Sequence, residues 1–140
     1  MTTTGRSPTP RADGMIVLDR ADCYLRLRSC NLGRVGVSLA GDLVILPVYY
    51  AVIDGDIVFR TAPGAKLSAA LLKTKIAFEA DGAAPGWSVR VRGHAEEVRY
   101  VEMQTRARTA LGYDWPAGDH EHIVRLQAEQ VTGRLLPPGS

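Results

Sequence analysis

The sequence predicts a mainly β protein: a small closed barrel of about six antiparallel strands, with helices only at its edges. Alternating apolar and polar residues recur in short runs along the 140-residue chain, which is typical of half-buried strands. Asp54-Gly55 stands between two apolar runs, a strong signal for a tight hairpin. Helical spacing of apolar residues occurs only in short segments between the strands, which argues against a parallel α/β sheet.

The expected elements follow in order from the N-terminus. Asp19 is suited to cap a helix that ends near residues 31–33, and Cys23, Leu27 and Cys30 form its apolar stripe. Strands are expected over residues 34–39, 43–53, 57–62, 76–80, 87–98 and 123–126, with a further match at 131–134. Two more short helices are expected over about 65–73 and 100–111, and Gly93 is expected to mark a bend in the long strand.

Length and composition indicate one domain over residues 15–136, with a disordered tail at 1–14 and a short C-terminal tail at 137–140. A net charge of +2 gives no reason to expect a nucleic acid or a membrane surface as partner. We expect a cytoplasmic protein, because we find neither a signal peptide nor an apolar run of about 20 residues. Cys23 and Cys30 are expected to be small core residues, the alternative being a thiol pair.

The strand after the predicted hairpin ends in a basic corner. Arg60 and Thr61 close the strand, Pro63-Gly64 breaks it, and Lys66 falls in the first turn of the next helix. A guanidinium, a hydroxyl, an ammonium and free helix N–H groups at one point make a phosphate site. The alternative is that the two basic residues are solvated charges.

The order of these parts resembles the flavin-nucleotide-binding split barrels, the pyridoxamine 5′-phosphate oxidase-like family. Further matches are residues 86–93, Gly-Trp-Ser-Val-Arg-Val-Arg-Gly, and residues 131–134, Val-Thr-Gly-Arg. The resemblance covers roughly residues 18–136 and implies a six-stranded split barrel. It also implies that the strand before the hairpin lies along the flavin ring and that the corner holds the phosphate. The cofactor-binding residues it implies are Leu46, Pro47, Val48, Tyr49, Phe59, Arg60, Thr61, Ala62, Lys66, Leu67, Trp87 and Ser88.

The chain departs from that family in three places. The end of the chain lacks the basic, His-containing segment that grips the substrate in authentic pyridoxamine phosphate oxidases, so we do not expect that reaction. Closer members often have Asn where Tyr49 stands and a hydroxyl residue where Ala65 stands. Loss of one hydrogen bond to a charged group lowers affinity by about one to two decades, so weak cofactor binding is expected.

Two classes of function remain open. The first is an oxidoreductase that uses FMN, or the 5-deazaflavin coenzyme instead, on an unknown small substrate. The second is a module that binds flavin or haem without catalysis, since no catalytic residue can be named. His120 and His122 lie two apart without a third ligand, so no metal site is expected.

The apolar run Leu43 to Ile53 predicts a homodimer. A small barrel has one interior, so only one face of this strand can fill it. We expect the other face to meet a second subunit over roughly 2,000 Å² or more, with the flavin in the seam. Pro47 cannot donate a hydrogen bond there, which fits either a ligand-facing backbone or a bulge. Trp87 is expected to be buried in the core or to contact the flavin or the seam.

Overall fold

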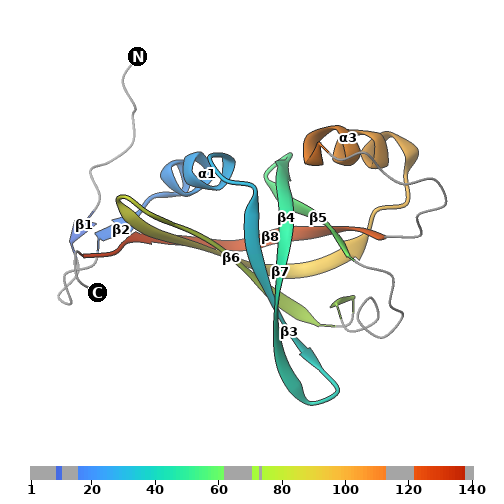
Figure 1. Ribbon diagram of the computed structural model, residues 1–140, viewed down its shortest axis with the longest axis horizontal. Helices are drawn as coiled ribbons and strands as arrows, with labels where there is room; N and C mark the ends of the chain where they lie inside the picture. The colour runs from blue at the N-terminus through green and yellow to red at the C-terminus, as the bar shows by residue number, and fades with distance from the viewer. Residues whose placement is uncertain (1–8, 11–15, 62–70, 73, 113–121, 138–140) are drawn as a thin grey trace.

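The computed structural model describes residues 9–10, 16–61, 71–72, 74–112 and 122–137 (Figure 1). The elements are β1 (Thr9–Pro10), β2 (Ile16–Leu18), α1 (Arg20–Arg28), β3 (Leu32–Leu39), β4 (Asp42–Ile53), β5 (Asp56–Thr61), β6 (Lys75–Ala83), β7 (Gly86–Glu97), α3 (Val101–Leu111) and β8 (His122–Leu135). Every strand pairing among them is antiparallel.

The strands close into a barrel. Their order is β1-β2-β8-β5-β4-β3-β6-β7, and an additional pairing of β7 with β8 joins the two ends. β3 to β8 therefore form the predicted six-stranded antiparallel barrel, and β2 extends the sheet from the far end of β8. Figure 1 shows α1 and α3 on the same side of the barrel, above its two ends.

A tight turn sets the register of β4 against β5. Asp54 and Gly55 both have positive φ, 53° and 81°, as a two-residue type I′ hairpin requires. The Tyr24 hydroxyl donates a 2.6 Å hydrogen bond to the Gly55 carbonyl and fixes α1 to that turn. The Asp54-Gly55 hairpin predicted from the sequence is confirmed.

The barrel interior is filled by aliphatic and aromatic side chains, with Leu27, Phe59 and Phe78 among the fully buried ones. α1 covers the core with Cys23 and Leu27, and Asp19 caps it by accepting a 2.8 Å hydrogen bond from the Asp22 amide. A second apolar cluster lies under α3, on the outer face of the barrel.

The two cysteines belong to this packing. Both are free thiols, Cys23 is buried, and the partly buried Cys30 packs against the core. Burial raises the pKa of the Cys23 thiol to about 11. The interpretation as a small core residue is therefore confirmed for Cys23, whereas Cys30 is partly buried and lies beyond the end of α1, not on its apolar stripe.

Several predicted boundaries were wrong. α1 ends at Arg28, and β3 already begins at Leu32, where a helix end was expected. β6 runs to Ala83 because its loop-like end pairs with β7. β8 is one strand of 14 residues, since its polar middle still pairs with β7.

Other expectations fall outside the described part of the chain. Of the predicted helix over 65–73, only residues 71 and 72 are described, and Leu71 is buried. Within the expected N-terminal tail, Thr9–Pro10 pairs with β2. The aromatic residues Tyr113 and Trp115 also lie outside the described residues.

Candidate functional site

The barrel is split between β4 and β5. β4 pairs with β3 from Asp42 to Tyr49, but it pairs with β5 only from Tyr50 to Ile53. Beyond the pair Tyr50↔Phe59 the two strands diverge. Over residues 43–49, no strand of the described chain pairs with the edge of β4 that faces away from β3.

Pro47 lies on this open edge. The Tyr50 amide donates a 2.9 Å hydrogen bond to the Asn31 carbonyl, so the backbone N–H and C=O of Tyr50 point towards β3. The direction of the backbone N–H and C=O alternates from residue to residue along a strand. The backbone carbonyl of Pro47, three residues before Tyr50, therefore points away from β3. The β3–β4 register is continuous through Pro47, which excludes the bulge. The missing N–H costs no ladder hydrogen bond, and the Pro47 carbonyl faces the split.

The end of β5 brings polar groups to the mouth of the split. Ile57, Phe59 and Thr61 are buried, and Arg60 between them is half-buried. The Thr61 hydroxyl oxygen is withdrawn from water and has no hydrogen-bond partner in the described structure. The Nη1 atom of Arg60 is withdrawn from water too. An unsatisfied buried hydroxyl costs about 1–3 kcal/mol, which a ligand oxygen at this point would recover.

Arg60 and Thr61 are consecutive residues at the end of β5, where side chains alternate between the two faces of the strand. Three further residues of the predicted corner, Ala62, Lys66 and Leu67, lie outside the described residues. Phe59 points into the barrel core and is 1% exposed, so its side chain serves packing.

An ionisable pair that the sequence did not reveal lies beside this corner. His122, the residue opposite Thr61 on β8, places Nδ1 at 2.6 Å from Glu97 Oε1. The side chains of His122 and Glu97 are 40% and 28% exposed. The pairing of β7 with β8 brings the two side chains together. His122 and Glu97 are 25 positions apart, and no spacing pattern in the sequence predicts a contact between them.

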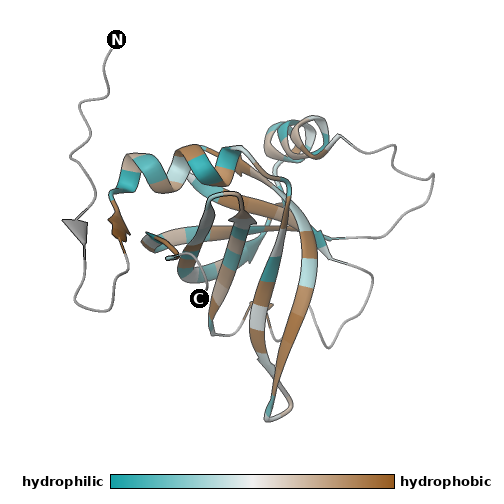
Figure 2. Cartoon of the chain, turned by 60° about the vertical axis from the view of Figure 1, so that its left-hand side comes forward, coloured by the Kyte–Doolittle hydropathy of each residue, from teal (hydrophilic) through white to brown (hydrophobic). Residues whose placement is uncertain are grey.

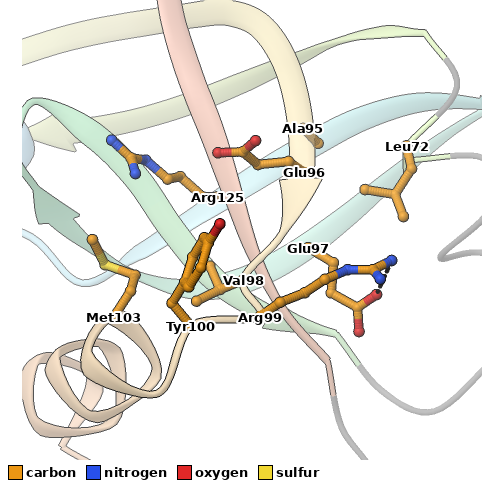
Figure 3. A pocket seen from close by; sticks show the side chains of 9 residues that line it. All are labelled: Leu72, Ala95, Glu96, Glu97, Val98, Arg99, Tyr100, Met103 and Arg125. Carbon is orange, nitrogen blue, oxygen red and sulfur yellow. Dashed lines mark ion pairs between the residues drawn. The ribbon is translucent and has the colours of Figure 1, made fainter.

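Glu97 also borders a cavity of about 780 Å³, shown in Figure 3. Its lining residues are Leu72, Ala95, Glu96, Glu97, Val98, Arg99, Tyr100, Met103 and Arg125. Arg125 is held in place by Asp56, with nitrogen–oxygen distances of 2.6 and 2.8 Å. The volume is in the range of small-molecule pockets.

Trp87 and Ser88 lie far from the corner within one chain. β8 has 14 residues, roughly 45 Å at about 3.3 Å per residue. Thr61 faces its first residue, and Trp87 faces its last, Leu135. Trp87 is buried in the barrel core under the Arg26 guanidinium, so burial alone explains it. Ser88 is half-buried on the outer face.

The two faces of β4 differ as expected. Val44, Leu46 and Val48 pack against the barrel core. Leu43 and Ile45, on the other face, are 90% and 72% exposed, and Tyr49 is 51% exposed. The turned view in Figure 2 shows the projecting β3–β4 hairpin with long hydrophobic stretches. A single chain therefore leaves an apolar strip, residues 43, 45, 47 and 49 of β4, in water.

No three of the described His, Cys, Asp and Glu side chains gather as a metal site would need. None of the described helices has the length and apolar character to span a membrane.

The fold and the split define a class of protein, and the comparisons agree with it. The family described as pyridoxamine 5′-phosphate oxidase matches residues 19–135, and this chain belongs to that family. An FAD-binding protein from Mycobacterium smegmatis is 35% identical with a TM-score of 0.78, over 88% of this chain and 99% of that one.

Two further relatives cover most of the chain. A putative pyridoxamine 5′-phosphate oxidase from Corynebacterium glutamicum is 34% identical with a TM-score of 0.76, over 90% of this chain and 96% of that one. An uncharacterized protein of Mycobacterium tuberculosis is 34% identical over 91% of this chain and 90% of its own length.

Proposed function

We propose that this protein binds a flavin nucleotide, FMN, with its phosphate at the end of β5. The Thr61 hydroxyl carries this proposal, because it is buried at the end of β5 and has no hydrogen-bond partner in the described structure. A guanidinium fork and a hydroxyl are the groups that phosphate oxygens prefer. The FAD-binding protein from M. smegmatis supports a flavin as the ligand class. The 5-deazaflavin coenzyme is the alternative that its spectrum would distinguish.

The ring would lie along the open edge of β4. The Pro47 carbonyl faces the split and offers an acceptor there, because β4 and β5 have already diverged. The backbone N–H and C=O of Leu46 and Val48 point towards β3, so these two residues would line the ring without donating or accepting a hydrogen bond.

A redox enzyme is the function that such a site supports best. A bound flavin supplies hydride transfer, and the chain's own residues bind, orient and exclude water. The hydrogen bond between His122 and Glu97, at 2.6 Å, lies beside the corner and would orient the imidazole towards it. The cavity bordered by Glu97 offers room for a small substrate.

The proposed assembly is a homodimer. The apolar strip on β4 needs a cover, and a two-fold partner would also bring its own Ser88 and Trp87 strand towards the corner. The flavin would then lie in the seam. We further propose a cytoplasmic location, since both cysteines are free thiols.

Paired ligands test the phosphate site. The visible spectrum of fresh protein first identifies any flavin, deazaflavin or haem that it carries. Arg60→Ala should then weaken FMN binding at least about tenfold, while riboflavin, which lacks the phosphate, binds both proteins equally. Arg106→Ala is the matched control, because Arg106 is committed to Asp54 at 2.9 Å. Equal losses for FMN and riboflavin would show that Arg60 acts through folding.

A further inference from the structure

Two arginines of β7 and β8 differ from all other arginines in the described chain. Arg34, Arg99, Arg106 and Arg125 bind carboxylates, and the rest make other polar or aromatic contacts. Among the described residues, neither Arg90 nor Arg134 has a hydrogen-bonding, ion-pairing or ring partner for its guanidinium. Both nevertheless line the same cavity.

That cavity has a volume of about 290 Å³ and lies on the outer face of the barrel. It is lined by Val17, Ser88, Arg90, Thr132, Gly133 and Arg134. The strand register explains the grouping, because Ser88 lies opposite Arg134 and Arg90 lies opposite Thr132. The two arginines are thus diagonal neighbours, with backbones about 7–8 Å apart, and two hydroxyl residues complete the square.

The carboxylates nearest to this square already have partners. Glu79 lies opposite Arg90 on β6, but it accepts hydrogen bonds from Arg34 at 2.6 and 3.1 Å and from Ser88 at 2.8 Å. Asp81, opposite Ser88, is 2.5 Å from Arg34. Arg34 brings only one positive charge to these two carboxylates, so Arg34, Glu79, Asp81, Arg90 and Arg134 together keep a net charge of +1.

Like charges at diagonal positions of a sheet repel each other, and an anion between them would remove that cost. Two guanidinium forks can each hold an oxyanion through paired N–H groups, and the Thr132 hydroxyl adds a donor. We propose that Arg90, Thr132 and Arg134 bind the oxyanion group of a small molecule, a phosphate or a carboxylate.

This site is separate from the phosphate corner within one chain. Arg134 lies next to the last residue of β8, whereas Thr61 faces the first, and the strand is roughly 45 Å long. An anion at one end of β8 therefore contacts no residue at the other end of the same chain.

Titration calorimetry of the full-length protein tests the proposal, with inorganic phosphate in one arm and succinate in the other. Saturable binding of inorganic phosphate would identify a phosphate ligand, and saturable binding of succinate would identify a carboxylate ligand. Arg90→Gln and Arg134→Gln should each weaken that binding about tenfold or more, and the double variant should abolish it. Arg92→Gln is the matched control on the same face of β7, because its side chain contacts Gln130. This control should change affinity less than about threefold.

Arg60→Ala separates the two sites. It should leave the phosphate or succinate titration unchanged while it weakens FMN, so the anion site can fail without the flavin proposal failing. Absence of saturation by either anion at about 10 mM would overturn the proposal. An equal loss with Arg92→Gln would overturn it too, since it would indicate general surface charge. Loss of the signal in Arg60→Ala alone would place the anion at the corner instead.

Discussion

Ile45→Glu should dissociate the proposed homodimer without unfolding the chain. Ile45 is 72% exposed in the single chain. Full burial of such a side chain is worth about 1.5–3 kcal/mol, so its exposed share is worth about 1–2 kcal/mol per copy. A two-fold interface contains the residue twice, which gives about 2–4 kcal/mol. The dimer dissociation constant should therefore rise about 30- to 700-fold, and a buried carboxylate would add to that.

Sedimentation at low micromolar concentration measures this change. The wild type should sediment as a dimer and Ile45→Glu as a monomer of 15.2 kDa. Leu25→Glu is the matched control, because Leu25 is 60% exposed on α1, away from the apolar strip. It should leave the dimer intact. A wild-type monomer that binds flavin tightly would refute both the assembly and the shared site.

Two predictions concern the stability of the single chain, measured by denaturant titration. Gly93→Ala should lower the free energy of unfolding by about 1–3 kcal/mol, because a Cβ there would lie 1.8 Å from the Gln127 carbonyl oxygen at the β7 bulge. Gly36→Ala is its control, since its nearest contact would be 4.0 Å, and an equal loss in both would refute the steric reason. For Glu79, burial raises the pKa, but hydrogen bonds from Arg34 and Ser88 outweigh it and hold the pKa below 4.5. The stability that wild type has over Glu79→Gln should be present at pH 7 and shrink as the pH falls below 4.5; a constant difference would exclude the carboxylate as its source.

Local signals in the sequence predicted the parts of the fold that depend on neighbouring residues. The Asp54-Gly55 turn needs positive φ at both positions, and few residue pairs allow it. Asp19 caps α1 because its side chain reaches an amide only three residues away. The bend at Gly93 is confirmed by a register shift between Arg92 and Gly93.

Contacts between distant strands could not be predicted in this way. The polar middle of β8 continues as a strand because β7 pairs with it along its length. His122 meets Glu97, and Arg90 approaches Arg134, only once that register is known. A single sequence carries no signal for such a register, since a shift of one residue would turn the other face of the strand outwards.

The geometry of β8 also bears on why one chain would need a second. The family resemblance implies that Arg60 and Ser88 both serve the cofactor, yet β8 separates their positions by most of its 14 residues. Bending the barrel cannot close this distance, because the interior is packed with buried side chains. A two-fold partner could close it, since an antiparallel arrangement sets one end of β8 near the opposite end of its copy. The apolar strip on β4 borders the split and gives such a partner a surface to bury.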